Sequence, residues 1–196
     1  MSHAINDEAL DTIFRTARTY RHWQDKPISP ALLMAIYDLM HWGPTSANSN
    51  PGRLIYVVSQ EAKERLKPHL DQNNVDKTMR APATAIIGYD LDFPRHVAQL
   101  NPHAADAKDW FTDPRQIETT AFRNGSLQGA YFIIAARALG LDCGPMSGFN
   151  NDGVDHAFFA GTAIKSNFLC NIGYGDAARL RPRGPRLSFD EACRIV

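Results

Sequence analysis

The sequence lacks the features that would place a protein in a membrane, on nucleic acid or in the secretory route. Lys and Arg together number 21, as do Asp and Glu, so the formal net charge is zero and no long-range field attracts nucleic acid or anionic lipid. The opening residues MSHAINDEAL carry acids where a signal peptide needs bases, and no apolar run approaches membrane length. We therefore expect a cytoplasmic protein that binds neither nucleic acid nor a membrane.

Cysteine and histidine are too few and too scattered to build a disulfide framework or a metal centre. The three cysteines, Cys143, Cys170 and Cys193, are odd in number and far apart in sequence. The seven histidines show no HxxxH or HExxH spacing. We expect reduced thiols, buried as apolar groups at Cys143 and Cys170, and no metal site.

A long helix is the strongest element that the sequence predicts. Asp113 can cap it, Pro114 occupies its first position, and Gly140 follows Leu139 as a stop signal. The second half, residues 130–139, is apolar on nearly every face, so it is buried either in its own core or against a partner. Small residues at 126, 129 and 130 share one face, where a flat group or another backbone could approach closely.

The remaining pattern predicts one α+β domain, residues 1–196, with a small mixed sheet under helices. Helices are expected at 6–17, 30–42, 60–70, 151–159 and from 189, and strands at 54–58, 83–89 and 168–172. Residues 73–77 are expected to link elements, and 144–148 to form a stiff turn against a cofactor. Residues 92–112 show no period, which is typical of a lid or binding loop.

One short motif resembles a dinucleotide fingerprint but lacks its context. Residues 173–178, GYGDAA, match GxGxxA after a predicted strand. That fingerprint needs a following helix and then a second strand ending in an acid. Here the chain continues through RPRGP and soon ends, so we interpret the motif as a turn.

Three other segments carry groups suited to a phosphate and a heterocycle. The planar guanidinium forks of Arg18, Arg21, Arg183 and Arg186 fit a phosphate, and Thr19 adds a hydroxyl donor. Hydroxyls and amides at residues 45, 46, 48 and 74 could read the polar edge of a ring. From spacing alone, solvated arginines and ordinary turns are the favoured interpretations.

Together, however, these segments resemble a known family, the FMN-dependent nitroreductase-like oxidoreductases. Residues 18–23, RTYRHW, are a close variant of its Arg-Ser-x-Arg-x-Phe motif. Residues 44–51, PTSANSNP, match its Pro-Ser-Ser-x-Asn-x-Gln-Pro loop with Asn for Gln, and 145–149, PMSGF, match its small-residue turn. The resemblance covers nearly the whole chain. It implies a nitroreductase-like fold with a small mixed sheet, a long central helix and an intertwined homodimer.

The resemblance also implies a set of cofactor-binding residues at the subunit interface. They are Arg18, Thr19, Arg21, Pro44, Thr45, Ser46, Asn48, Asn74, Lys77, Pro145, Met146, Ser147, Gly148, Arg183 and Arg186. The arginines would hold the FMN phosphate, and the loop at 44–48 would reach the flavin of the partner. Asn74 and Lys77 would contact the pyrimidine edge, while Pro145 and Met146 would cover a ring face. Many members carry an acid at the position of Ser147, and this chain does not. The contact with flavin N5 would therefore rest on the backbone N–H groups of Ser147 and Gly148, without a side-chain nucleophile.

The implied activity is ping-pong hydride transfer through flavin N5 from NADPH or NADH to a small acceptor. Segments such as HWGPTSAN and KSNFLCNIGYGD most resemble members that reduce malonic semialdehyde to 3-hydroxypropionate in pyrimidine degradation. The substrate carboxylate would need a cation, for which the candidates are Arg95, His96, His103, Lys108, Arg115, Arg123 and Lys165. The alternatives are a broad nitro or quinone reductase, a flavin-binding redox module without turnover, and a purely structural helical protein.

Overall fold

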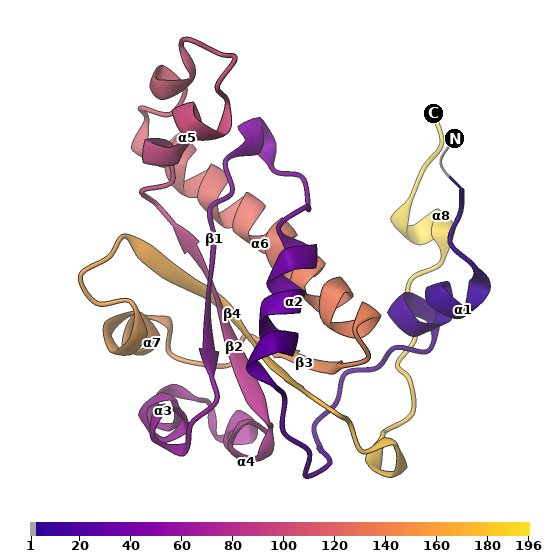
Figure 1. Cartoon of the computed structure of the whole chain (residues 1–196). Coiled ribbons are helices and arrows are strands. Elements are labelled where there is room, and N and C mark those ends of the chain that lie inside the picture. Colours follow the sequence, from indigo (N-terminus) through magenta and orange to yellow (C-terminus); the bar gives the residue numbers. More distant parts are fainter. Residues whose placement is uncertain (1–2) are drawn as a thin grey trace.

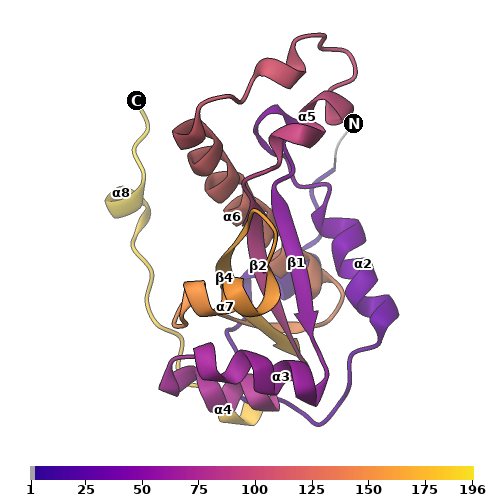
Figure 2. The ribbon, with the colours of Figure 1, turned by 90° about the vertical axis from the view of Figure 1, so that its left-hand side faces the viewer.

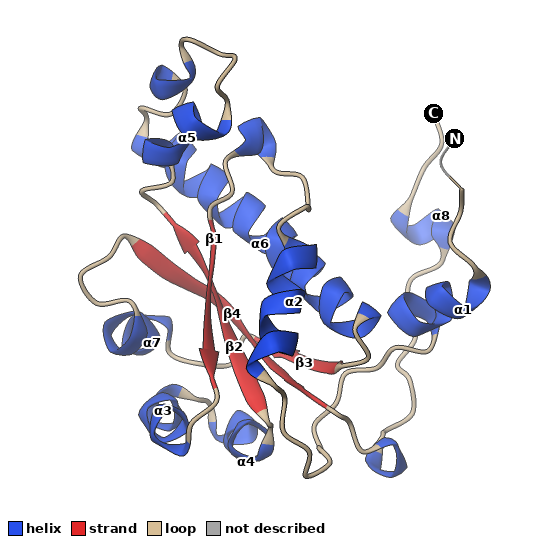
Figure 3. Ribbon diagram, in the orientation of Figure 1, coloured by secondary structure: helices blue, strands red, loops and turns tan. Residues whose placement is uncertain are grey.

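The computed structural model describes residues 3–196 and is built on a four-stranded sheet in the order β1-β2-β4-β3 (Figures 1 and 3). The strands are β1 (Gly52–Val57), β2 (Ala83–Asp90), β3 (Asp142–Met146) and β4 (Ile164–Gly173). Each pair of neighbours is antiparallel, and an isolated parallel bridge joins Thr19 to Cys143 beside β3. The expected α+β fold is therefore confirmed, but the sheet, expected to be mixed, is antiparallel throughout β1 to β4, and the parallel bridge lies outside these paired strands.

Helices cover both faces of this sheet. Their bounds are α1 (Asp7–Leu10), α2 (Pro30–Met40), α3 (Gln60–Leu66), α4 (Gln72–Arg80), α5 (Pro94–Leu100), α6 (Pro114–Ala138), α7 (Asn151–Phe158) and α8 (Phe189–Ala192). The π-helical turn Asp11–Arg15 continues α1. Figures 1 and 2 show α2 and α6 on one face and α3, α4 and α7 on the other. No helix within residues 3–196 is long and apolar enough to cross a membrane.

The central strand β2 divides the hydrophobic core into two layers, because successive side chains of a strand point to opposite faces. Ala85 and Ile87 pack with α2 and α6 in the first core, together with Phe132. Ile86 packs on the other face with Leu66 of α3 and other buried residues. The prediction of a buried central strand at 83–89 is confirmed, and the layers hold α4 and α6 in fixed positions on the sheet.

Helix α6 begins and ends where its capping residues predict. The Asp113 carboxylate accepts a hydrogen bond from the Gln116 N–H at 3.1 Å, and Gly140 has φ 78°, the left-handed conformation that glycine tolerates. Within its length, Phe132 is buried in the first core, whereas Leu127 and Tyr131 stay 46% and 37% exposed. The apolar half of α6 is therefore divided between the core and an open surface.

Residues 92–112, expected to lack regular structure, form α5 and a 3₁₀ turn over Ala107–Asp109. The segment has its own small core, in which Phe93 and Val97 are fully buried. The Phe93 and Phe111 rings meet edge to face with centroids 4.9 Å apart. The sequence did not predict this cluster, because its residues come from three separate short segments and so show no regular spacing.

Two shorter predictions were also wrong. Residues 73–77, expected as a link, lie inside α4, because Asn74 and Thr78 supply a buried polar face in place of an apolar stripe. The expected turn at 144–148 begins instead as the end of β3. Proline is tolerated at position 145 because β3 is an edge strand. Pro145 has no N–H to donate, but no strand on the open side of β3 needs that hydrogen bond. The GxGxxA segment is confirmed as a turn: β4 ends at Gly173, and a single 3₁₀ turn, Ala177–Arg179, follows.

The last residues run away from the sheet and its helices (Figures 1 and 2). The helix expected from residue 189 begins with a capping box, in which the Ser188 N–H donates to Glu191 Oε2 at 2.9 Å. The apolar side chains of this tail are largely exposed, Leu187 at 70% and Phe189 at 57%. The tail thus carries a local helix signal but leaves its apolar groups uncovered within one chain.

Candidate functional site

The predicted phosphate-binding arginines meet although they come from opposite ends of the chain. The Tyr20 N–H donates to the Cys143 carbonyl at 3.0 Å, which holds residues 18–21 against the edge strand β3. Arg183 donates to the Ala17 carbonyl at 2.9 Å, and Arg18 donates to the carbonyl of Arg181, 163 residues away. A cavity of about 530 Å³ results, with a wall that contains all five predicted residues: Arg18, Thr19, Arg21, Arg183 and Arg186.

A second cavity, of about 650 Å³, shares Arg21 with the first and extends the basic surface to α4. Asn74 and Lys77 line it from successive turns of that helix. Burial lowers the pKa of Lys77, and the positive charge of Arg21 lowers it further. Such repulsion between neighbouring cations is relieved by an anion, so the two cavities together suit a phosphorylated ligand with a polar ring edge.

The end of β3 packs tightly against α4. The Gly148 carbonyl accepts hydrogen bonds from Asn74 Nδ2 at 2.6 Å and from the Asp71 N–H at 3.1 Å. A Cβ atom at Gly148 would come within 2.6 Å of both Asn74 Nδ2 and Asp71 Oδ2, so glycine is required for this approach. The Met146 side chain is buried in the second core, beside Thr78. Of the two side chains expected to cover a ring, only half-buried Pro145 remains at the surface.

Side-chain hydrogen bonds, as well as its prolines, hold the loop at 44–50 in place. The Ser46 N–H donates to Asn124 Oδ1 at 2.8 Å, and Asn48 Nδ2 donates to the Leu100 carbonyl at 3.0 Å. Thr45 Oγ1 accepts from the Asn50 N–H at 3.1 Å. Ala47, Asn48 and Asn50 have positive φ angles of 52°, 47° and 42°. Non-glycine residues held in this conformation store strain and cluster at functional sites.

This loop does not join the arginines within one chain. In Figures 1 and 2 it lies beside α5, whereas α4 lies toward the opposite end of β2. The two cavities that contain Arg21 include no residue from 44–50. The structure thus brings together two of the predicted cofactor segments, the arginines and α4, and leaves the third on a distant surface.

Several residues of the site carry no sequence signal. Arg137, in the last turn of α6, lines the first cavity, donates to the Ile13 carbonyl at 3.1 Å and has a buried Nε without a hydrogen-bond partner among residues 3–196. A basic residue at a helix C-terminus is ordinarily read as complementing the helix dipole. Arg179 and Arg181 line both basic cavities; we expected that part of the tail to be basic without assigning them a role.

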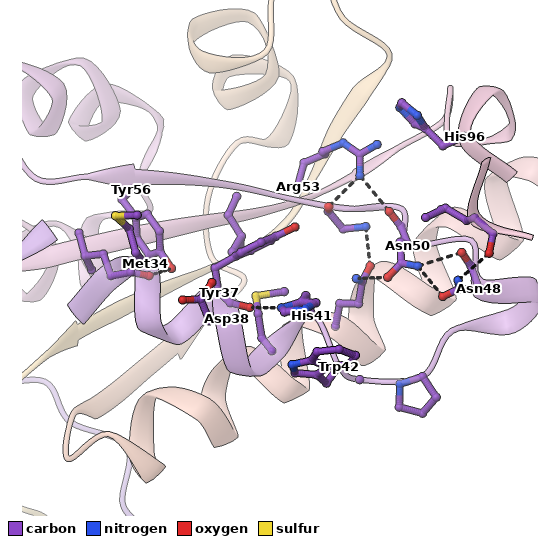
Figure 4. Close-up of a pocket in the computed structure, with 18 of the residues that line it drawn as sticks. Met34, Tyr37, Asp38, His41, Trp42, Asn48, Asn50, Arg53, Tyr56 and His96 are labelled. Carbon is purple, nitrogen blue, oxygen red and sulfur yellow. Dashed lines mark hydrogen bonds between the residues drawn. The ribbon is translucent and has the colours of Figure 1, made fainter. Parts of the chain in front are cut away.

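A larger cavity lies elsewhere, between α2, β1 and α5, and has a volume of about 1120 Å³ (Figure 4). Met34, Tyr37 and Trp42 supply an apolar wall and are 67%, 54% and 76% exposed. At the other end Arg53 donates to the Asn50 carbonyl at 2.9 Å and to Asp90 Oδ2 at 2.8 Å. This cavity holds none of the predicted phosphate-binding residues, so size alone does not identify the site.

One of the candidates for a substrate carboxylate is already paired with acids. Arg95 pairs with Asp92 at 3.0 Å and Asp90 at 3.8 Å, and its Nε donates to His96 Nε2 at 3.0 Å. His103 lies exposed in the loop after α5. Arg123 instead lines a separate cleft beside Ser46. The structure therefore distinguishes candidates that the sequence left equal.

The thiols have the environment that the sequence predicts. Cys143 and Cys170 are free and fully buried, and Cys193 is free and exposed. Burial raises the pKa of the Cys170 thiol, which keeps it protonated and unreactive. Residues 3–196 contain no group of three or more His, Cys, Asp or Glu side chains arranged to hold a metal ion.

Known proteins with similar sequence and fold place these features in a family. The Nitroreductase family model matches residues 14–174. A relative from Stenotrophomonas maltophilia, provisionally named an NADH dehydrogenase/NAD(P)H nitroreductase, is 61% identical over the full length of both chains. A provisionally named nitroreductase from Bacillus subtilis superposes with a TM-score of 0.87 at 20% identity, over 97% of this chain and 100% of its own. Another, from Exiguobacterium sibiricum and solved in complex with FMN, gives 0.84 at 18% identity over all of both chains. The chain therefore belongs to the nitroreductase family.

Proposed function

We propose that this protein is an FMN-dependent NAD(P)H oxidoreductase whose acceptor is malonic semialdehyde, reduced to 3-hydroxypropionate. One observation carries the cofactor: arginines from residues 18–21 and 179–186 converge on a cavity that continues to Asn74 and Lys77. The FMN complex of the Exiguobacterium relative and the NAD(P)H in the Stenotrophomonas relative's name support the same cofactors here. FMN, when bound, supplies hydride transfer between a nicotinamide and an acceptor.

The residues present fit FMN in charge and in shape. Guanidinium groups of Arg18, Arg21 and Arg183 would bind the phosphate through charge-assisted hydrogen bonds. Lys77 and Asn74 would meet the pyrimidine edge, where a positive charge stabilises the anionic reduced ring. The glycine at 148 lets the chain after β3 pack against Asn74, because a Cβ atom there would collide with that side chain. The chain thus binds and orients the cofactor.

We also propose a homodimer in which the loop at 44–50 of one protomer completes the site of its partner. Two observations support it: the loop lies far from the arginines of its own chain, and the faces of α2 and α6 remain apolar and exposed. Leu127 and Phe122 of α6 are 46% and 52% exposed. Phe14, which follows α1, is 53% exposed. A second copy would cover these side chains and bring Thr45, Ser46 and Asn48 to the cofactor.

A broad nitro or quinone reductase is the second candidate. The names of the relatives favour it, since the Stenotrophomonas protein is provisionally a nitroreductase. Flat electron acceptors need only an open ring face, whereas an acid aldehyde needs a cation to hold its carboxylate. The two functions therefore differ in how the acceptor is selected and share the same cofactor site.

The deciding experiment is anaerobic. The purified holoenzyme is reduced with one equivalent of NADPH and mixed with malonic semialdehyde or, separately, with a nitroaromatic compound, and flavin absorbance is followed. We expect rapid reoxidation by the aldehyde with formation of 3-hydroxypropionate. Reoxidation by the nitro compound alone would establish the broad reductase instead, and no reduction by NADPH or NADH would indicate a flavin-binding module without turnover.

A further inference from the structure

A cleft of about 600 Å³ on the outer side of α6 combines two arginines with an apolar wall. Arg115 and Arg123 line it from the helix, Trp110 and Phe111 from the preceding segment, and Ser46 from the loop at 44–50. Residues 115 and 123 are eight positions apart, about 12 Å along the helix and on the same side. The cleft is distinct from the basic cavities that hold Arg18 and Arg21.

Among the candidate arginines within residues 3–196, Arg115 and Arg123 are the two without a partner. Within residues 3–196 neither Arg115 nor Arg123 forms an ion pair or a side-chain hydrogen bond, and both are exposed. Glu118 shares a neighbouring cavity with Arg123 but does not pair with it. In contrast, Arg95 pairs with two acids, and Lys165 pairs with Asp155 at 3.4 Å. An unpaired guanidinium retains its full fork for a carboxylate.

In the proposed homodimer the cleft would lie beside the partner's cofactor, where an acceptor binds. The Ser46 N–H donates to Asn124 Oδ1 at 2.8 Å, which fixes the loop to α6 at the residue next to Arg123. The same loop is the one proposed to reach the partner's cofactor. Trp110 is held by its Nε1–H bond to Asp106 at 3.0 Å, and Phe111 by its ring contact with Phe93. The wall beside the arginines is therefore apolar and fixed in place.

We propose that Arg123, assisted by Arg115, is the specificity site for a carboxylate on the electron acceptor. The guanidinium of Arg123 binds the carboxylate in bidentate fashion, and Arg115 adds positive charge at the outer end of the cleft. The apolar wall receives the carbon skeleton between the carboxylate and the reducible group. This inference rests on the proposed oxidoreductase function and identifies its acceptors as small monocarboxylates.

The test compares acceptors that differ in one charge. Arg123→Gln, Arg115→Gln and the wild-type holoenzyme are assayed with 4-nitrobenzoate against 4-nitrobenzamide, and with malonic semialdehyde against propanal. We expect Arg123→Gln to lower kcat/KM for the acids about tenfold or more, mainly through KM, because a hydrogen-bonded charge pair is lost. Arg115→Gln should give a smaller loss. The neutral acceptors, the KM for NADPH and the FMN content should remain unchanged.

Two further variants separate recognition from a structural role. Arg123→Lys retains the charge without the fork and should restore part of the activity with acids. Lys67→Gln removes an equal charge just after α3, where Lys67 pairs with Glu64, and should leave the ratio of acid to neutral rates at the wild-type value.

The outcomes are distinguishable. Equal losses with acids and amides, or no loss with acids in Arg123→Gln, would overturn the carboxylate site while leaving the oxidoreductase intact. A selective loss with nitrobenzoate would support the site even if malonic semialdehyde were not reduced. A wild-type enzyme that reduces none of these acceptors would overturn both the proposed function and the inference.

Discussion

At the scale of single residues, the basic site depends on contacts between the two ends of the chain. Arg183 donates to the carbonyls of Arg15 and Ala17, each at 2.9 Å, and so anchors the tail to residues that follow α1. These hydrogen bonds use part of the Arg183 guanidinium and leave its remaining N–H groups for a ligand. Positive charges gathered this way repel one another, so the site should be most stable with an anion bound.

Arg21 is the residue that connects the two basic cavities, and its replacement should weaken cofactor binding. In Arg21→Gln we expect the dissociation constant for FMN to rise roughly tenfold to a hundredfold, because one charge-assisted hydrogen bond to the phosphate is lost. Titration monitored by flavin fluorescence measures this change. The pKa of Lys77 should rise in the same variant, since Arg21 contributes to lowering it. An FMN affinity equal to that of wild type would place the phosphate elsewhere.

Asp142, at the start of β3, provides a pH-dependent test of the same region. Its carboxylate accepts from the Gly175 N–H at 2.8 Å, and burial raises its pKa above the ordinary value of 3.8. A raised pKa in the folded state means that the contribution to stability is present at low pH and is lost as pH rises through the folded pKa. Asp142→Asn keeps the acceptor oxygen without the buried charge.

We therefore expect the stability of Asp142→Asn relative to wild type to increase between about pH 4 and about pH 7. Urea unfolding of both proteins across this range measures the difference. Asp38→Asn, at an exposed position on α2, serves as the control for loss of a carboxylate. A stability difference that does not vary with pH would show that burial of Asp142 imposes no cost on its ionised form.

At the scale of elements, the small residues of α6 determine how closely it packs on the sheet. We expected residues 126, 129 and 130 to admit a flat group or another backbone. Gly129 does face a flat group, the Phe168 ring of β4, where an added Cβ would come within 2.5 Å of a ring atom. Ala130 is exposed, and Ser126 accepts a hydrogen bond from Asn167 Nδ2 at 2.8 Å. The close approach of α6 to β4 at Gly129 is therefore part of the core packing within one chain.

Gly129→Ala should destabilise the fold despite the higher helix propensity of alanine. Propensity favours the substitution by about 1 kcal/mol, whereas overpacking a core costs about 1–3 kcal/mol. We expect a net loss in the free energy of unfolding, measured by urea denaturation. Gly184→Ala, in the tail with nothing within 4 Å of the new Cβ, is the matched control. A stabilised Gly129→Ala protein would mean that α6 can move away from β4 at little cost.

At the scale of the whole molecule, a single chain leaves both its functional surfaces and its apolar faces incomplete. The loop at 44–50 lies apart from the arginines, and α2, α6 and the tail expose large side chains. An exposed apolar surface that is extended over several elements is typical of a subunit interface. Cofactor binding and association of two copies should therefore depend on each other.

Leu127→Glu, on the exposed face of α6, should disrupt this association. A buried, unpaired carboxylate at an interface is strongly unfavourable, so we expect monomers with reduced FMN content. Light scattering after size-exclusion chromatography measures the mass, and absorbance measures the flavin. Gln60→Glu, at an exposed position on α3, introduces the same charge outside the proposed interface and should remain dimeric. A dimeric, flavin-loaded Leu127→Glu protein would exclude this face of α6 from the interface.

Much of the architecture follows from local rules that operate within a few residues. Asp113, Pro114 and Gly140 determine the bounds of α6, and the continuous apolar run at 83–89 determines a central strand. The motifs at 18–21 and 44–51 identify the family and the segments that we propose to hold its cofactor. These features are legible in the sequence because capping, proline and glycine effects act on neighbouring backbone groups.

The sequence could not predict contacts and pairings between residues that are far apart in the chain and meet only in the folded structure. The aromatic cluster of α5, the burial of Met146 and the placement of Arg137 in the basic cavity each depend on packing between separate elements. The same is true of charge: Arg95 and Arg123 look alike in sequence, but Asp90 and Asp92 neutralise only the former. Local propensity determined the elements, while side-chain packing and ion pairing, which require three dimensions, decided which cations remain free to bind a ligand.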